Sequence, residues 1–335
     1  MNKRLLIVGS SSIHVYNFIA LVQSYFDEVL LISNQARDDQ KIKVEVLDFH
    51  LGLRSLQTIK QIRNIVQKFK PTHIHIHQAN TYAFLTLLAV KNHTSKKVLN
   101  AWGSDILLNP KKNIFLKEMV KYSLKNVDVL VADSDTVLKE ATKYISTIQT
   151  QNVNFGIDTI LCNSQKEKII YSNRLHKPLY NIDKVLISFS KFVKQHSDWR
   201  LVLAGNGEET EKLKSLAEGL CIRSKVDFIG FVDKKTNFEY YCKSKIYVSI
   251  PNSDSISLSL VEAIISDCIV FVSDLEANHE IVDCSIGFIE NDLENIHFMQ
   301  YQEIDRPMQK KRISTIKKLF SKEYNRQRYI EIYEN

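Results

Sequence analysis

The stretch LLIVGSSSIHVYNFIALVQSYFDEVLLIS, residues 5–33, places two apolar runs on either side of a helical segment. LLIVG (5–9) ends in a Gly/Ser turn, and EVLLIS (28–33) follows a helical pattern that runs roughly from Tyr16 to Phe26. Short continuous apolar runs of this kind are typical of buried parallel strands. The stretch therefore predicts a strand–helix–strand unit, with a ligand expected at the carboxyl ends of the strands.

The same alternation continues through the rest of the chain. Further strands are expected at 43–49, 72–77, 97–102 and 127–134, and in a second series at 168–173, 199–205, 225–230, 245–250 and 268–274. A chain of 335 residues is long enough for two such domains. We predict an α/β fold with Rossmann-like domains at 1–158 and 168–312, and a C-terminal helix over 313–335.

Charge, cysteine content and hydropathy exclude some partners and locations for this protein, but they do not identify its function. A net charge of +7 suits an anionic small molecule, a membrane surface or nucleic acid, and does not choose among them. The basic residues are dispersed and form no recognition motif, so a nucleic-acid partner is not expected. Five scattered cysteines without a CxxC favour reduced thiols and a cytoplasmic protein over disulfides or a zinc site. The N-terminus has no signal peptide pattern, and no apolar run is long enough to span a membrane.

Two short motifs have ordinary structural explanations. HIHIHQ (73–78) aligns three histidines on one strand face, but their spacing of about 7 Å is too wide for one tetrahedral metal ion. We expect His73 to be a packed or edge residue and His77 to lie at the mouth of the strand. DSD (133–135) resembles the metal-binding DxD of some sugar transferases, yet Ser134 or Asp135 is better explained as a helix N-cap.

Small polar turns follow several predicted strands. GSSSIH (9–14) lacks the GxGxxG of dinucleotide sites, although its small residues would let a ligand approach the backbone. WGSDILL (102–108), AGNGEE (204–209) and GF (230–231) end strands in the same way, and each is also compatible with an ordinary turn or cap.

The second half adds charged residues next to such turns. In NRLHKPLYNID (173–183), Arg174 and Lys177 follow a strand and would suit a diphosphate, although solvation at the surface is an equal alternative for Lys177. SDSISLSLVEA (253–263) alternates serine with apolar residues as an exposed strand would. Since a strand is already expected at 245–250, we interpret 252–257 as a loop that leads into a helix carrying Glu262.

Taken in order, these segments resemble retaining glycosyltransferases of family 4, which have the GT-B fold. The resemblance rests on NRLHKPLYNID, AGNGEE, GFV (230–232) and SDSISLSLVEAIISDCIVFVSDLEANHEIV (253–282). PTHIHIH, WGSDI and NFGID (154–158) support it in the first half, and the final helix is similar to one that crosses back onto the first domain. It implies two domains that face a cleft, and transfer of a sugar from a nucleotide diphosphate sugar, most often a uridine diphosphate sugar.

The resemblance also assigns roles to residues. Asp254 stands where the family has a first glutamate and would contact the sugar, while Glu262 would bind the ribose. Arg174 would neutralise the leaving diphosphate, with Lys177 as the candidate for a second cation. The family's usual lysine position, some six residues after the arginine, holds Tyr180 here. The remaining expected donor-site residues are Gly9, Ser10, Gly205, Gly207, Phe231, Val232, Ser257, Leu258 and Ser259.

The acceptor is expected on the first domain. Many family members carry a histidine near Trp102 that this chain lacks, so Asp105 becomes the candidate that handles or orients the acceptor hydroxyl, beside His14 and His77. The family often builds bacterial surface polysaccharides or lipid-linked oligosaccharides, so the acceptor would be a glycan or a lipid-linked sugar. The basic, partly apolar segment 109–126 would then rest on the inner face of the membrane, or alternatively pack as an ordinary core helix. Neither metal nor cofactor is expected.

Two other functions remain open. A nucleotide-sugar 2-epimerase of the same fold would need a set of acids and histidines that this spacing fits less well. A non-catalytic glycosyltransferase-like partner is compatible with Asp254 in place of glutamate and with the missing histidine.

Overall fold

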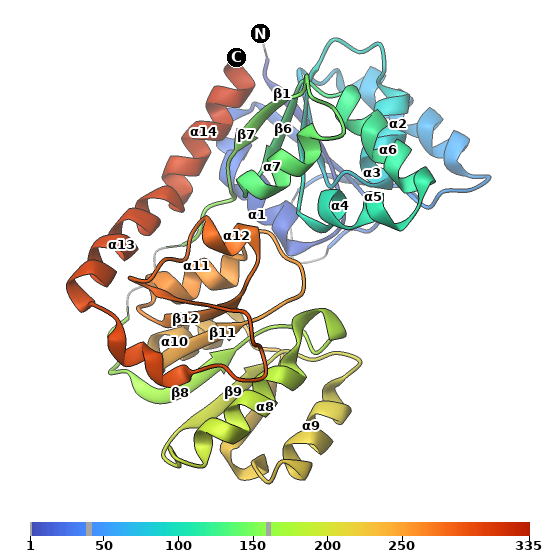
Figure 1. Ribbon diagram of the computed structural model, residues 1–335. Helices are drawn as coiled ribbons and strands as arrows, with labels where there is room; N and C mark the ends of the chain where they lie inside the picture. Colours follow the sequence, from blue (N-terminus) through green and yellow to red (C-terminus); the bar gives the residue numbers. More distant parts are fainter. Residues whose placement is uncertain (1, 38–41, 159–161) are drawn as a thin grey trace. The chain divides into compact units, whose positions relative to one another are not determined.

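The computed structural model describes residues 2–37, 42–158 and 162–335, which form two compact α/β units (Figure 1). The first unit comprises residues 1–156 together with 322–335, and the second comprises 157–321. Each unit is built on one parallel sheet, as the apolar runs predict.

The first unit contains a seven-stranded sheet in the order β3-β2-β1-β4-β5-β6-β7. Its strands are β1 (Arg4–Val8), β2 (Glu28–Ser33), β3 (Val44–Val46), β4 (His73–His77), β5 (Lys96–Asn100), β6 (Val129–Ala132) and β7 (Gln149–Asn152). Its helices are α1 (Ile13–Val22), α2 (Ser55–Phe69), α3 (Thr81–Ala89), α4 (Ser104–Leu107), α5 (Asn109–Lys112), α6 (Ile114–Lys125), α7 (Asp135–Thr142) and α14 (Lys322–Glu334). The central strands β1 and β4 pair in parallel, and apolar clusters cover both faces of the sheet.

The second unit contains a six-stranded sheet in the order β10-β9-β8-β11-β12-β13. Its strands are β8 (Glu167–Ser172), β9 (Arg200–Ala204), β10 (Val226–Gly230), β11 (Ser244–Ser249), β12 (Ile269–Ser273) and β13 (Gly287–Glu290). Its helices are α8 (Ile182–Val193), α9 (Thr210–Gly219), α10 (Lys234–Lys243), α11 (Leu258–Ile265), α12 (Glu276–His279) and α13 (Arg306–Leu319). In both sheets the strand order reverses beside the unit's first strand, β1 or β8, and folds of this kind bind ligands at the carboxyl edge beside such a reversal.

The C-terminal tail differs from the single helix expected over 313–335. The helix α13 begins at Arg306 and packs on the second unit, where Ile313 and Ile316 are buried in its core. The helix α14 begins at Lys322 and packs on the first unit through Tyr329 and other apolar residues. The chain thus returns to the first unit after Ser321.

Other helix boundaries follow from local chemistry. The hydroxyl of Ser134 accepts from the backbone N–H of Thr136 at 3.1 Å, which confirms the N-cap interpretation of the DSD motif. The α2 helix ends with Lys70 in the left-handed conformation, immediately before Pro71. No helix among the described residues is both long and apolar enough to cross a bilayer.

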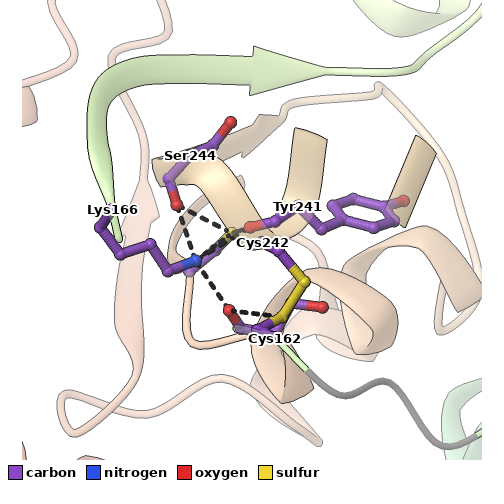
Figure 2. Close-up of a disulfide and its surroundings, with 7 residues drawn as sticks. Cys162, Lys166, Tyr241, Cys242 and Ser244 are labelled. Carbon is purple, nitrogen blue, oxygen red and sulfur yellow. Dashed lines mark hydrogen bonds between the residues drawn. A yellow bond between two sulfur atoms is a disulfide. The ribbon is translucent and has the colours of Figure 1, made fainter. Parts of the chain in front are cut away.

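The expectation that every cysteine is reduced is wrong. Cys162 and Cys242 form a disulfide that ties the segment leading into β8 to the end of α10 (Figure 2). The ammonium of Lys166 lies beside this disulfide and donates to the carbonyls of Tyr241, Ser244 and Ser266 at 2.7–2.9 Å. The two cysteines are 80 residues apart, so their spacing in the sequence gave no indication that the fold brings them together.

Candidate functional site

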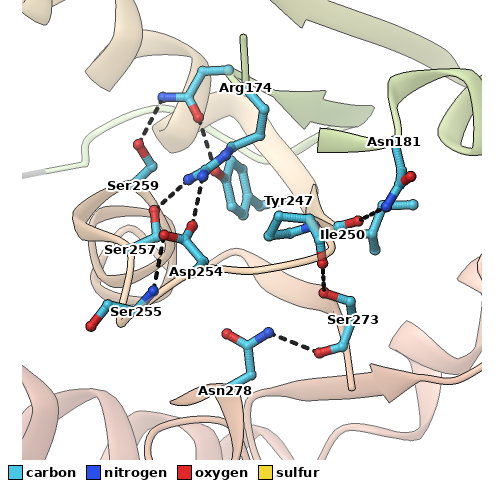
Figure 3. Close-up of polar contacts among 12 residues, drawn as sticks. Arg174, Asn181, Tyr247, Ile250, Asp254, Ser255, Ser257, Ser259, Ser273 and Asn278 are labelled. Carbon is cyan, nitrogen blue, oxygen red and sulfur yellow. Dashed lines mark hydrogen bonds and ion pairs between the residues drawn. The ribbon is translucent and has the colours of Figure 1, made fainter. Parts of the chain in front are cut away.

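The loop between β11 and α11 forms the centre of the candidate site in the second unit. Neighbouring strands and loops hold its backbone: Ser273 donates to the carbonyl of Pro251 at 2.7 Å, and Asn181 donates to that of Ile250 at 2.8 Å (Figure 3). The helix α11 then begins at Leu258, with Ser257 as its N-cap residue. The expected loop-to-helix transition in SDSISLSLVEA is therefore confirmed, and the alternation of serines does not mark a strand.

Arg174 joins this loop from the end of β8. Its Nη2 lies 2.6 Å from Oδ2 of Asp254, and its Nη1 donates to Oγ of Ser257 at 2.6 Å (Figure 3). The guanidinium also stacks over Tyr180, 4.5 Å from the ring centroid. The structure thus brings together three of the residues that the sequence singled out, from segments about 80 positions apart.

The start of α11 can also receive an anion. The first N–H groups of a helix have no partner within it and carry a partial positive charge. The side chain of Ser257 makes no capping hydrogen bond, because its Oγ is engaged by Arg174. A guanidinium and a helix N-terminus therefore converge at one place, which is an arrangement suited to phosphate oxygens.

Burial changes the acidity of both carboxylates of the site. It raises the pKa of Asp254 above its usual value, and the adjacent positive charge of Arg174 opposes that shift. Burial also raises the pKa of Glu262 to about 7, opposed by the charge of Lys234 and by a hydrogen bond with Tyr241. Glu262 lies on the first turns of α11, within the same unit as Arg174, and is half-buried.

The glycines of AGNGEE have a steric role. Gly205 has φ +108°, and a Cβ there would lie 2.7 Å from the carbonyl oxygen of Arg174. A Cβ on Gly207 would clash with the carbonyl oxygen of His176. The two glycines therefore let this loop pass directly against the segment that carries Arg174.

Other expected donor-site residues occupy more open positions. Lys177 is exposed at the start of the short 3-10 turn Pro178–Tyr180, and the contacts to Asp254 and Ser257 come from Arg174 instead. Phe231 is 72% exposed after β10, and Val232 is half-buried. In the first unit, Gly9 is buried and Ser10 half-buried at the end of β1.

The acceptor-side expectation for Asp105 needs correction. Its side chain is 2% exposed, and both oxygens accept backbone hydrogen bonds, from Ala79 at 2.6 Å and from Trp102 at 3.0 Å. Burial raises the pKa of this carboxyl, and the hydrogen bonds from backbone N–H groups oppose the rise. Asp105 ties the loop after β4 to the loop after β5, so it does not present a free oxygen to an acceptor.

His77 also differs from its expected position at an open strand mouth. It is fully buried, with its ring 5.9 Å from Trp102 and 4.7 Å from Phe18, and burial lowers its pKa to about 3. His14 is exposed on α1 and makes an edge contact with Trp102 at 5.7 Å. Of the expected acceptor-side residues, His14 and Trp102 therefore remain near the surface, while His77 is buried and packs against Trp102.

The other histidines of β4 pack against the C-terminal helix. His73 donates from Nε2 to the carbonyl of Tyr333 at 3.1 Å, and Nδ1 of His75 lies 2.8 Å from the Tyr333 hydroxyl. This confirms the packing interpretation of His73. Among the described residues, no three His, Cys, Asp or Glu side chains are grouped as a metal site would require.

Comparison with known families agrees with this geometry. Residues 158–292 match the model of the glycosyl transferases group 1, and residues 3–134 match that of the glycosyl transferase 4-like family. The chain belongs to the group 1 glycosyltransferases. The first match contains Arg174, Asp254, Ser257 and Glu262, and the second contains Trp102 and Asp105.

Individual relatives are more distant. An uncharacterized glycosyltransferase of Haemophilus influenzae is 25% identical over 232 residues, which cover 67% of this chain and 64% of that protein. The chain matches less than two thirds of the length of its curated relatives. A Rickettsia africae glycosyltransferase has a TM-score of 0.81 at 17% identity, with 99% and 98% of the two chains covered. The Anabaena protein HepE, solved with UDP and glucose, has a TM-score of 0.82 at 12% identity over 100% of both chains. These structural likenesses confirm the GT-B fold.

Three residues of the candidate site, Asn173, Tyr241 and Tyr247, were not identified from the sequence. Asn173 donates to the hydroxyl of Tyr241 at 2.8 Å and to Ser259 at 3.3 Å, and it accepts from Tyr247 at 2.9 Å. This network joins the end of β8 to the start of α11. Asn173 stands immediately before Arg174 in the sequence, and this position is the signal that could have identified it. Tyr241 and Tyr247 look like ordinary core aromatics in the sequence.

Proposed function

We propose that this chain transfers a sugar, with retention of configuration, from a nucleotide diphosphate sugar to a glycan or lipid-linked acceptor. The observation that carries the proposal is the convergence of Arg174, Asp254 and Ser257 at the N-terminus of α11. Family membership supports the reaction class, and the complex of HepE with UDP and glucose supports a uridine diphosphate sugar as the donor.

In the proposed reaction, the bond between the anomeric carbon and the β-phosphate oxygen breaks. Arg174 and the first N–H groups of α11 stabilise the negative charge that develops on the departing diphosphate. The acceptor oxygen attacks from the same face of the sugar and forms the new bond. Its proton passes to an oxygen of the departing phosphate, so no strong base on the protein is needed. This agrees with the burial of Asp105.

The two remaining carboxylates would hold the donor. Glu262 would accept hydrogen bonds from the vicinal hydroxyls of the ribose. Asp254 would face the sugar while it also orients Arg174. Lys177 is exposed and near enough in the chain to supply a second positive charge, while Phe231 and Val232 would flank the base.

The acceptor would approach the first unit near His14 and Trp102. We place the reaction in bacterial surface polysaccharide synthesis, as the family resemblance implies, at the inner face of the membrane.

A thermal-shift panel of nucleotide sugars tests the donor, because a ligand bound only by the folded protein raises its stability. We expect a rise with one uridine diphosphate sugar and slow release of UDP from it, both lost in Arg174→Ala. Lys310→Ala, an exposed residue of α13, serves as a control for a change of charge. Absence of any binding or turnover across the panel would refute the proposal, and an epimerised sugar formed without acceptor would replace it with the epimerase alternative.

A further inference from the structure

Basic residues occur throughout the chain, but acidic residues are scarce in one segment, which therefore carries the net positive charge. Residues 49–126 contain 13 lysines and arginines and 2 acidic residues, a net charge of +11. The whole chain has 45 basic and 38 acidic residues, so the remainder holds 32 and 36, a net charge of −4. One of the two acidic residues in the segment, Asp105, is buried. The segment is therefore strongly basic, and two of its lysines pair with acidic residues: Lys121 with Glu118, and Lys111 with Glu140 of α7.

This segment contributes a layer of helices to the first unit. The helix α2 packs against α3, and α3 packs against α6, so the three lie together on one side of the sheet (Figure 1). Both α2 and α6 are helices of a parallel α/β sheet and begin at the edge where the strands end. Their N-terminal ends therefore lie along the carboxyl edge of the sheet, where the proposed acceptor would bind.

Large apolar side chains protrude at both of these helix starts. Leu53 is 103% exposed and Leu56 is 79% exposed before and within the first turn of α2. Ile114 and Phe115 are 70% and 55% exposed in the first turn of α6. With Leu51, which is 38% exposed, these residues form what we call the apolar rim.

The backbone at the apolar rim is well organised, so the exposure does not come from an irregular loop. Before α2, Ser55 donates from its N–H to the carbonyl of Gly52 at 3.0 Å, and Gly52 donates to Oγ of Ser55 at 3.0 Å. Before α6, the side chain of Asn113 accepts from the N–H of Leu116 at 2.9 Å. Two built turns thus hold apolar side chains in water, which is typical of an interaction surface.

A groove continues from Phe115 along α6. Its volume is about 510 Å³, and its lining is mainly apolar. Phe115, Met119 and Tyr122 line it beside the charged residues Glu118, Lys121 and Lys125. The groove gives the apolar rim a hydrophobic continuation that lysines border.

We propose that the apolar rim and the basic layer of α2 and α6 form a docking surface for an anionic membrane. Leucine, isoleucine and phenylalanine would enter the boundary between head groups and acyl chains, while the lysines and arginines pair with anionic head groups. A second copy of the chain is a poorer occupant, because it would bring one basic surface against another. This docking surface adds residues 51–56 to the membrane contact expected for 109–126. The proposal does not rest on the proposed transfer reaction.

Vesicle flotation of the purified full chain tests this surface. We expect binding to vesicles of phosphatidylcholine mixed with phosphatidylglycerol, weak binding to pure phosphatidylcholine, and release of the protein at high salt. The double variant Leu53→Ser and Leu56→Ser, and separately Phe115→Ser, should lower the partition coefficient about tenfold or more. Met308→Ser is the matched control, since Met308 is 55% exposed on the second unit and should bind as the wild type does.

The contribution of charge is measured separately. Replacing Arg54, Lys60 and Lys112 with glutamine should lower binding at low salt on the order of 100-fold, since each basic residue near the surface contributes about 1 kcal/mol. The same change at Lys310, Lys311 and Lys317, exposed on α13, should have little effect. Absence of vesicle binding, equal binding by the apolar-rim variants, or self-association through the apolar rim in light scattering would each overturn the proposal. None of these results depends on a sugar donor.

Discussion

Arg174 and Asp254 form an ion pair in which Nη2 and Oδ2 lie 2.6 Å apart, with only 10% and 26% of the two side chains exposed. The pair fixes the guanidinium at the start of α11, and Ser257 and Tyr180 hold it on two other sides. Under the proposed function, Asp254 would keep the guanidinium oriented at the start of α11 while the diphosphate approaches.

Replacing Arg174 with lysine should lower kcat about 100- to 1,000-fold, because an ammonium cannot form the two directed contacts of the guanidinium. Asp254→Asn should have a smaller effect on kcat and raise the KM for the donor, since the asparagine no longer orients Arg174 by charge. Initial rates of UDP release over a range of donor concentrations separate the two effects. Lys177→Ala provides the comparison, and a loss there as large as in Arg174→Lys would make Lys177 the principal phosphate cation.

Glu262 should make donor binding depend on pH near neutrality. Its pKa of about 7 means that the carboxylate gains charge as pH rises from 6 to 8, and an ionised carboxylate accepts hydrogen bonds from ribose more strongly. Donor affinity should therefore rise through this range, and it should be weaker and flat in Glu262→Gln. Isothermal titration with a uridine diphosphate sugar measures it, since the diphosphate of such a donor has no group that titrates in this range. A wild-type affinity independent of pH would contradict the assignment of Glu262 to the ribose.

The same shift has an opposite effect on stability. A carboxyl whose pKa is raised from 4.5 in the unfolded chain to about 7 in the folded one binds its proton more tightly in the folded state. This group should therefore lower the free energy of unfolding as pH rises from about 4.5 to 7, with no further change above that. Denaturant unfolding of wild type and Glu262→Gln at several pH values should show the difference between the two proteins growing across that window.

Local patterns predicted most of the fold and part of the site. The apolar runs identified every central strand, but the strands β7 and β13 were missed, because QTQN is polar and GFIE is too short to show a period. The family resemblance predicted that Arg174, Asp254 and Ser257 lie in one site. The burial of Asp105 and His77 could not be predicted, because the sequence pattern at the end of a strand is the same whether a polar side chain points to solvent or lies under a neighbouring loop.

Gly205→Ala should destabilise the second unit by about 1–3 kcal/mol. The residue has φ +108°, and a methyl group would lie 2.7 Å from the carbonyl oxygen of Arg174. Gly219→Ala is the matched control: Gly219 ends α9 with free space around its Cβ position, so alanine there should be neutral or slightly stabilising. Thermal unfolding compares the two, and equal melting temperatures would contradict the steric role of Gly205.

Asp105→Ala should lower the free energy of unfolding by about 2–4 kcal/mol, because it leaves the N–H groups of Ala79 and Trp102 without their acceptor. Asp105→Asn keeps one acceptor oxygen and should lose less. The decisive comparison is between stability and UDP release in both variants. An asparagine variant of wild-type stability with a large loss of kcat would return Asp105 to a direct role in the reaction.

Opening the disulfide between Cys162 and Cys242 should destabilise the second unit. The bond closes a loop of 80 residues, and the chain-entropy model gives about 4.5 kcal/mol for a loop of this length. Because Cys242 adjoins Tyr241, whose hydroxyl binds Asn173 near the start of α11, reduction should also weaken donor binding.

Unfolding with and without dithiothreitol, in the wild type and in the double variant Cys162→Ala with Cys242→Ala, measures the effect of the disulfide on stability. Dithiothreitol should lower the stability of the wild type to that of the double variant and leave the double variant unchanged. Cys221→Ser, which removes an exposed free cysteine, is the control and should respond to dithiothreitol as the wild type does. If dithiothreitol shifts the double variant equally, the loss of stability has another source.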